Sequence, residues 1–385
     1  MSAKGLKCST DEHANVTNEL IINGGEFHLN TSDDAVHSDY NLTITKGIFE
    51  IITGDDGVHA DQYLILGEKD QSDNSLLTIN IGKSYEGLEG AQVYIYSGTY
   101  HIIASDDGIN SAGDTDENCQ NGGGMGQGGN NGGPGGNNGG PGGNNGEPGG
   151  NNGEPGRNNG EPGGNNGGPG GNMGARNLQM NNQCYIFHIY IYGGDIYVNT
   201  ESDGLDANGN IYIQGGKLEV WGMSPGGDGD PIDLDGTLYI TGGIVLGGGS
   251  QGMEPIHSSA STISQNFIYS TNSFSANKEI SIKSGDEVIR TITIPKQINY
   301  LFYTSSVTDS NYKFSEGNTV YQTGSTNVNP DNPSGQGFPG NMPNPPNPPN
   351  SDQNQNGETN VDDNGNSGNF AINGLIIYIL IFIIL

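Results

Sequence analysis

Basic residues are scarce in this chain of 385 residues. It carries 13 Lys and Arg against 44 Asp and Glu, so its formal net charge at pH 7 is −31. Such a protein repels nucleic acid and anionic membrane surfaces, which excludes both as direct partners. The acidity suits an extracellular protein that meets dissolved divalent cations.

Cysteine is also scarce, with three residues and neither a CxxC pair nor a His/Cys cluster. A structural zinc site is therefore not expected. Cys119 and Cys184 flank a low-complexity segment, and in an oxidising compartment we expect a disulfide between them. Two free buried thiols are the alternative. Cys8 is left over in either case.

Long hydrophobic runs are absent except at the C-terminus, where 370–385 is apolar. Small residues and a polar spacer precede this tail, a pattern typical of a GPI-anchor signal; a retained tail anchor is the alternative. Both predict a cell-surface glycoprotein, although 1–8 lacks a signal-peptide core and we expect the true N-terminus to be missing. Sequons at Asn15, Asn30 and Asn41 weakly support secretion.

One four-residue signature recurs seven times, at spacings of about 20 to 30 residues apart from one long gap. It consists of an acid, a small residue or Pro, an aliphatic residue, and then His, Asn, Asp or Glu. Its instances begin at Asp34, Asp56, Glu86, Asp107, Asp203, Asp230 and Glu254.

Short alternating strands separate the signatures and are bounded by Gly or Gly-Gly, which supplies positive φ at corners. Examples are 41–45, 93–96, 210–213 and 237–240, followed by 48–51, 99–102 and 217–220. Repeats of this length with strands alone predict an all-β, right-handed parallel β-helix. A β-sandwich does not explain the recurring signature. The signature aliphatics should form one inward stack: Val36, Val58, Leu88, Ile109, Leu205, Ile232 and Ile256.

The long gap is a Gly/Asn/Pro segment with too few apolar residues to form a core, and we expect a disordered insert there. Antiparallel strand patterns with hairpin turns follow the repeats and predict a cap, and a Pro-rich stalk comes next. The predicted organisation is 19–113 first half of the β-helix, 114–183 insert, 184–260 second half, 261–322 cap, 323–369 stalk and 370–385 tail.

Stacking seven acids about 4.8 Å apart costs free energy, because each pair of charges repels by about 1 kcal/mol even in water. Protonation, backbone N–H groups or bound cations can offset that repulsion. Asp-Gly corners often accept backbone N–H bonds, and we expect this of two of the seven. For the rest we predict calcium, which takes six to eight oxygen ligands. The predicted calcium ligands are Asp34, Asp55, Asp56, Glu86, Glu89, Asp106, Asp107, Asp203, Asp206, Asp230 and Asp233.

Histidine occupies the fourth signature position at His37, His59 and His257. This pattern suggests zinc, but a polar row on the surface of the repeats is the interpretation we favour at this level.

The corners also resemble a known family. Residues 54–61 (GDDGVHAD), 83–90 (KSYEGLEG) and 105–110 (SDDGIN), with 202–206 and 230–236, are similar to calcium-dependent polygalacturonate-binding β-helix proteins, often described as carbohydrate-binding domain-containing. The similarity extends over 20–320 without the insert. It implies a pectate-lyase-like fold, several calcium ions and binding of acidic plant cell-wall polysaccharide. The insert and the apolar tail depart from the bacterial pattern.

The predicted function is therefore non-catalytic, calcium-dependent binding of a pectin-like polysaccharide by a monomer. Lys83 lies close to the sugar in this prediction, and Tyr85 or Trp221 stacks on it. A pectate-lyase-like enzyme is one alternative, with Lys83 as the base, but surrounding carboxylates disfavour a neutral lysine. An adhesive surface coat in which calcium serves only stability is the other.

Overall fold

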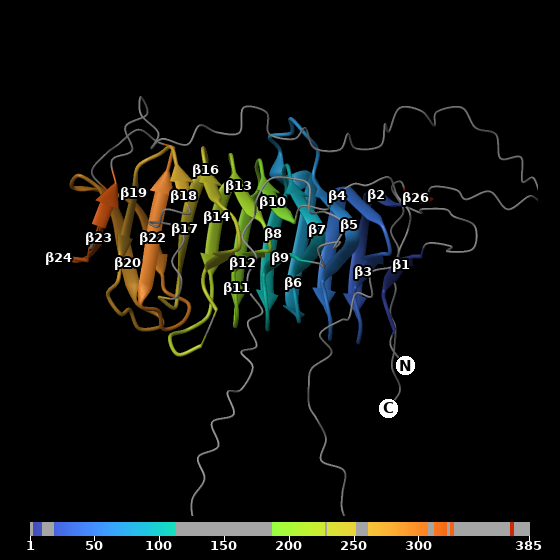
Figure 1. The fold of residues 1–385 in the computed structure, drawn as a ribbon, viewed down its shortest axis with the longest axis horizontal. Coiled ribbons are helices and arrows are strands. Elements are labelled where there is room, and N and C mark those ends of the chain that lie inside the picture. Colours follow the sequence, from blue (N-terminus) through green and yellow to red (C-terminus); the bar gives the residue numbers. More distant parts are fainter. Residues whose placement is uncertain are drawn as a thin grey trace, which may run out of the picture. The chain divides into compact units, whose positions relative to one another are not determined.

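The computed structural model describes residues 3–9, 19–112, 187–227, 229–251, 261–306 and 312–321, and the backbone of 324–326 and 370–372. These residues form strands and one turn of 3₁₀ helix, η1 (Asn74–Leu76), so the described chain is all-β. One large sheet is mostly parallel and a four-stranded sheet is antiparallel (Figure 1). Within these ranges no helix is both long and apolar enough to cross a membrane.

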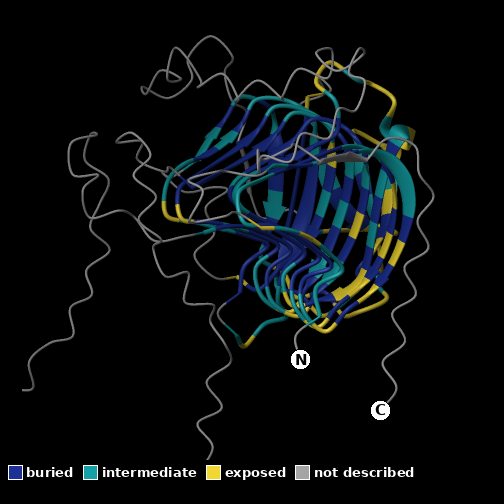
Figure 2. Cartoon of the chain, turned by 90° about the vertical axis from the view of Figure 1, so that its right-hand side faces the viewer, coloured by how far each residue is buried: buried dark blue, intermediate teal, exposed yellow. Residues whose placement is uncertain are grey.

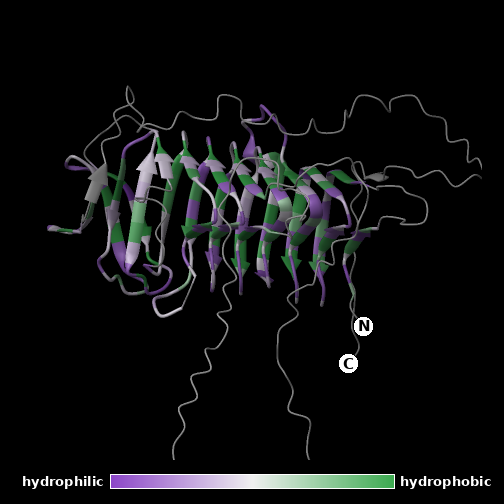
Figure 3. Ribbon diagram, in the orientation of Figure 1, coloured by the Kyte–Doolittle hydropathy of each residue, from purple (hydrophilic) through white to green (hydrophobic). Residues whose placement is uncertain are grey.

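The large sheet contains three ladders of parallel strands, which the chain visits in turn. The first ladder runs through β2 (Glu19–Asn30), β4 (Asn41–Ile52), β6 (Leu77–Ser84), β8 (Thr99–Ala104), β11 (Asp195–Thr200), β14 (Lys217–Trp221) and β17 (Ile244–Gly249). The strands predicted at 48–51, 99–102 and 217–220 all belong to it. Side chains alternate between buried and exposed from Gly47 to Ile52 of β4, because one face packs inward. Figure 3 shows hydrophobic and hydrophilic residues interspersed along the ladders.

The second ladder carries the signatures. It runs through β1 (Leu6–Cys8), β3 (Val36–Ser38), β5 (Val58–Leu66), β7 (Leu88–Ile95), β9 (Ile109–Ser111), β12 (Leu205–Ala207) and β15 (Ile232–Leu234). The signature aliphatics from Val36 to Ile232 pair in register and are at most 1% exposed, which confirms the predicted inward stack. The seventh signature, at 254–257, lies outside the described residues.

The third ladder joins the N-terminal halves of β2 and β4 to the C-terminal halves of β5 and β7. It continues through β10 (His188–Ile191), β13 (Asn210–Ile213), β16 (Leu238–Ile240) and β18 (Ser261–Ile263). β26 (Phe370–Ile372) pairs with its first strand. Because β18 is parallel to β16, the parallel ladder extends into the segment predicted to begin the cap.

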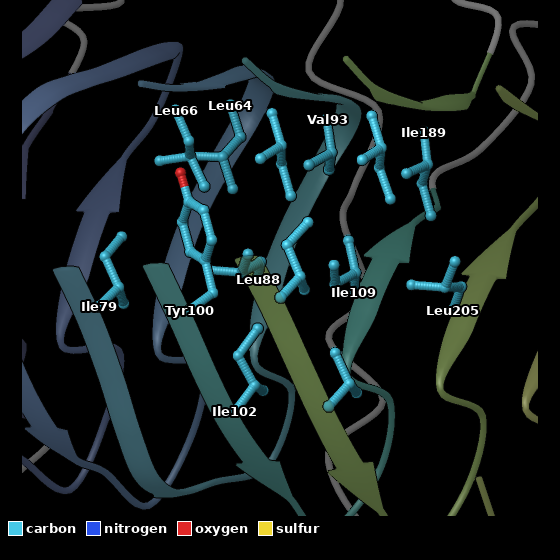
Figure 4. Close-up of a cluster of buried hydrophobic side chains, with 14 of the residues drawn as sticks. Leu64, Leu66, Ile79, Leu88, Val93, Tyr100, Ile102, Ile109, Ile189 and Leu205 are labelled. Atoms are coloured by element: carbon cyan, nitrogen blue, oxygen red, sulfur yellow. The ribbon is translucent and has the colours of Figure 1, made fainter. Parts of the chain in front are cut away.

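Aliphatic side chains from all three ladders meet in one core (Figure 4). Leu88 and Ile109 come from the second ladder, Val93 from the third, and Ile102 from the first. Buried residues line the inner side of the ladders, which Figure 2 views end on. Each ladder alone exposes an apolar face, so the three are stable only together.

Two kinds of glycine shape the corners. Gly-Gly corners have positive φ, as at Gly194 (φ 98°) and Gly216 (φ 81°), as predicted. The signature glycines serve another purpose, because a Cβ on Gly87 would lie 2.3 Å from the carbonyl oxygen of Gly108. At Gly87 the next signature therefore approaches too closely for a side chain, whereas Ala35 and Pro231 occupy the same position in two other signatures.

Antiparallel strands follow the ladders. β22 (Tyr300–Ser305) pairs with β17 and with β19 (Phe267–Ser270), which also pairs with β25 (Gly324–Thr326). The four-stranded sheet comprises β20 (Glu279–Ser284), β21 (Glu287–Thr293), β23 (Tyr312–Glu316) and β24 (Thr319–Val320). The hairpin between β20 and β21 turns at Gly285 (φ 60°), in the segment where the sequence predicted antiparallel strands with hairpin turns.

Candidate metal and carbohydrate site

Two rows of polar side chains run along the second ladder. The acid row consists of the first signature residues, Asp34, Asp56, Glu86, Asp107, Asp203 and Asp230. The fourth-position row pairs in register and consists of Lys7, His37, His59, Glu89, Asn110, Asp206 and Asp233. The ladder therefore brings the predicted calcium ligands of both halves, except Asp55 and Asp106, into two continuous rows.

Backbone N–H groups link members of the acid row. Asp34 Oδ1 accepts the Asp56 N–H at 3.4 Å, and Asp56 Oδ1 accepts the Glu86 N–H at 3.3 Å. Beyond the insert, Asp107 Oδ1 accepts the Asp203 N–H at 3.0 Å. Asp203 accepts the Asp230 N–H in the same way. Four carboxylates thus gain a backbone donor, against the two that the sequence led us to expect, and each keeps a second oxygen for another partner.

Bases neutralise the N-terminal end of the rows. Lys4 Nζ lies 2.9 Å from Asp33 Oδ1 and also contacts Asp34. Although burial opposes ionisation of Asp34, His37 and Lys4 hold the pKa of its carboxyl well below the usual range. Burial likewise disfavours charge on His59, but Glu89 and Asp56 outweigh it and raise the pKa of its imidazole to about 10.

The middle of the rows, at Glu86 and Asp107, is uncompensated. Glu86, Asp106 and Asp107 place a carboxylate oxygen each within 4.8 Å of one another. Burial, with repulsion from Glu89 and Asp56, raises the pKa of Glu86 to about 9. Burial also raises the pKa of Asp107 to about 6. In the part of the chain that the structure describes, no Lys, Arg or His forms an ion pair with these three acids.

The acids of the next signature also have raised pKa values. Burial, with repulsion from Asp107 and Asp233, raises the pKa of Asp203 to about 8 and that of Asp206 to about 7. Neutralisation of these carboxylates by a dication would lower each of those pKa values, because a positive charge favours the ionised form. The oxygen-only donors of this stretch fit calcium.

A third acidic group surrounds Lys4. Asp33, Asp34 and Asp55 hold ligand atoms within 4.8 Å of one another. Burial and repulsion from Asp56 raise the pKa of Asp55 to about 6. The Lys4 ammonium already contacts two of the three carboxylates, so this group has less need of an ion.

Lys4 belongs to an additional signature that the sequence reading missed. Lys4-Gly5-Leu6-Lys7 keeps the glycine and the aliphatic residue but has Lys at the acid position. Leu6 pairs with Val36, and Gly5 N–H donates to Asp34 O, as in the later signatures. The Gly-Leu pair was the available signal, and the requirement for an acid concealed it.

The predicted sugar-contacting residues differ in accessibility. Tyr85 is 43% exposed, and a hydrogen bond with Asp106 raises its pKa, so its ring lies beside the uncompensated acids. Lys83 is exposed nearby on β6. The prediction that Trp221 stacks on a sugar is wrong, because its side chain is 0% exposed and packs against the cap. Its Nε1–H donates to Glu219 of the same strand at 3.0 Å. A buried indole has no face to offer a sugar.

Several predictions concern residues outside the described ranges: Asn15, Cys119, Cys184, and most of the C-terminal tail. Among the described sequons, Asn30 is exposed at the end of β2, and Asn41 is half-buried at the start of β4. Cys8 is a free thiol.

Comparison with known proteins adds one finding. Residues 1–128 match the model of a family described as carbohydrate-binding domain-containing protein. The matched range contains both the acids that bases neutralise near Lys4 and the uncompensated acids up to Asp107. No curated protein and no solved structure matches the chain. The family match supports a carbohydrate-binding role and a carbohydrate partner. It also suggests that this role is non-catalytic.

Proposed function

We propose that this protein binds an acidic polysaccharide through calcium ions held on the uncompensated part of the two rows, without catalysis. The observation that carries the proposal is the group of Glu86, Asp106 and Asp107, whose oxygens converge within 4.8 Å. A cation among them would offset their mutual repulsion while all three carboxylates stay ionised. Asp203, Asp206 and Asp233 offer a second set of oxygens on the next signatures.

Calcium also solves the problem of recognition. A chain with a net charge of −31 repels a polyuronate, so their carboxylates need a bridging dication. Protein carboxylates fill part of the shell of six to eight oxygens and leave positions for sugar carboxylates. The exposed ring of Tyr85 supplies an apolar face beside these positions, on which a sugar can stack.

The finer architecture belongs to the same proposal. Three ladders visited in fixed order, with one inward aliphatic stack, support a parallel β-helix, and the crossover preference favours the right-handed form. Such a scaffold spaces equivalent carboxylates about 4.8 Å apart along its length. The proposed location is the extracellular surface, with the apolar tail as GPI signal or anchor.

Calorimetry with polygalacturonate tests the proposal. We expect binding in calcium, no binding after chelation, and at least about tenfold weaker binding for Asp107→Asn, which removes a charged ligand. Asp286→Asn, in the exposed β20–β21 hairpin, is the matched control and should bind like the native protein. Equal affinity with and without chelator would refute the role of calcium, and release of unsaturated product would refute the non-catalytic assignment.

A further inference from the structure

Two imidazoles at the N-terminal end of the fourth-position row take no part in the calcium proposal. His37 on β3 and His59 on β5 pair in register. Their ring centroids lie 4.7 Å apart and the rings meet edge to face. Both residues are buried, at 7% and 9% exposure.

Both rings direct Nδ1 toward carboxylates. His37 Nδ1 lies 2.6 Å from Asp34 Oδ2. His59 Nδ1 lies 3.1 Å from Glu89 Oε2, 3.4 Å from Asp56 Oδ2 and 3.8 Å from Asp34 Oδ2. Ligand atoms of a tetrahedral ion with bonds of about 2.0–2.1 Å are separated by about 3.3 Å. The carboxylate oxygens around His59 lie at nearly this distance from its Nδ1.

The other nitrogen of each ring faces an outer carboxylate. His37 Nε2 lies 2.8 Å from Asp39 Oδ1, and His59 Nε2 lies 3.5 Å from Asp61 Oδ1. Histidines that bind metals usually donate their second N–H to a carboxylate, which fixes the tautomer and orients the ring. This arrangement leaves Nδ1 of both rings available as a ligand.

Hydrogen bonding within the described residues does not satisfy these rings. His37 Nδ1 and His59 Nε2 are buried without a hydrogen-bond partner there, although His37 Nδ1 lies within ion-pair distance of Asp34 Oδ2. A buried polar atom without a partner costs about 1–3 kcal/mol. An ion bound at Nδ1 would satisfy His37.

We infer that this cluster binds a divalent transition ion of the zinc class, with nitrogen ligands from His37 and His59 and oxygen ligands from Asp34, Asp56 and Glu89. Imidazole favours zinc over calcium, which takes oxygen ligands. The two rows then hold two kinds of ion, a zinc-class ion among the histidines and calcium among the uncompensated acids.

Titration of the full chain with Zn²⁺ and Co²⁺ tests the inference. We expect one ion bound in excess Ca²⁺, visible absorption bands of four- or five-coordinate Co²⁺, and a zinc-dependent shift of the His59 ring nitrogens in NMR spectra. His59→Gln should abolish tight uptake. Asp39→Asn removes the carboxylate that lies 2.8 Å from His37 Nε2, and it should weaken uptake about 10- to 100-fold, as loss of an outer carboxylate does. The control is His101→Gln, whose ring stacks on Tyr197 away from the rows.

The outcomes separate this site from the calcium site. Zinc uptake should survive Asp107→Asn, and calcium-dependent binding of polygalacturonate should survive His59→Gln. The inference is wrong if the NMR shifts of the histidine ring nitrogens in the native protein do not change on addition of zinc. It is also wrong if His37→Gln and His59→Gln bind Zn²⁺ like the native chain. Both imidazoles would then act as buried cations that neutralise the acids. The NMR measurement needs no variant, so it decides even if a substitution prevents folding.

Discussion

Single glycines set the closest approach between successive signatures. A Cβ on Gly108 would lie 2.1 Å from Val198 Cγ1 and 2.6 Å from the carbonyl oxygen of Gly204. Neither the carbonyl nor the core side chain can withdraw without displacing the next signature, so the position accepts no side chain.

Gly108→Ala should therefore destabilise the protein by about 1–3 kcal/mol, the usual cost of overpacking a close contact. Gly82→Ala is the matched control, because a Cβ there meets only ordinary contacts at 3.8 Å or more. Urea unfolding followed by circular dichroism measures both. A midpoint for Gly108→Ala equal to that of Gly82→Ala would contradict the steric account.

His188 is a buried neutral base on the third ladder. Its Nδ1 accepts the Asn210 N–H at 2.8 Å, its ring meets Tyr190 and Tyr212 edge to face, and burial lowers its pKa to about 4. The unfolded chain has the ordinary pKa near 6.5, so between pH 6.5 and 4 the unfolded state binds more protons.

This difference predicts that His188 contributes a loss of stability as pH falls from 6.5 to 4, of roughly 2–3 kcal/mol. His188→Asn should remove this dependence, while the exposed His101→Asn should keep it. Chemical unfolding at a series of pH values compares the three proteins. The same slope in the His188 variant and the native protein would show that the imidazole is not held neutral.

At the scale of the element, the second ladder carries a change of charge along its length. Its first strands bear Lys7, His37 and His59 at the fourth signature position, where its later strands bear acids and Asn110. Lys4 takes the place of an acid at the end of the acid row, where it contacts Asp34, a residue only 2% exposed.

Lys4→Met should cost about 3 kcal/mol, because it removes one of the cationic partners of a buried carboxylate. Lys46→Met is the matched control, since Lys46 pairs with Glu68 at the surface and such pairs contribute about 0–1 kcal/mol. Thermal unfolding of both variants distinguishes the two situations. Equal midpoints would mean that Asp34 does not depend on the ammonium.

At the scale of the whole molecule, excess negative charge gives metal-free protein an unusual pH dependence. Burial raises the pKa of Glu86 to about 9, of Asp203 to about 8 and of Asp206 to about 7. The native state keeps these protons well above pH 4.5, where the unfolded chain has lost them. Native protein therefore binds more protons than unfolded protein across this window, and stability falls as pH rises.

Chelated protein should thus be less stable at pH 8.5 than at pH 6, by a few kcal/mol at most because the groups are coupled. Calcium should reverse this trend, since ligand carboxylates are bound ionised. Chemical denaturation at both pH values, with and without calcium, gives the four free energies of unfolding to compare. A chelated protein as stable at pH 8.5 as at pH 6 would argue that these acids are not held protonated in the metal-free state.

Much of the scaffold was readable because local patterns and packing agree. Val36 to Ile232 recur with the same neighbours, and an inward stack is how such a repeat buries them, so the ladder register followed from the signatures alone. Period-two alternation located the strands of the first and third ladders. The parallel pairing of β18 escaped prediction, because three residues carry too little pattern to tell a last repeat from a cap.

The chain by itself determined the repeat, the inward aliphatics and the row of acids, because these depend on residue type at fixed spacing. Only the tertiary structure decided which charges meet. It placed Lys4 against Asp34, His59 among three carboxylates, and Trp221 against the cap. Electrostatic energy and burial depend on distances between residues far apart in the sequence, and those distances exist only when the strands are stacked.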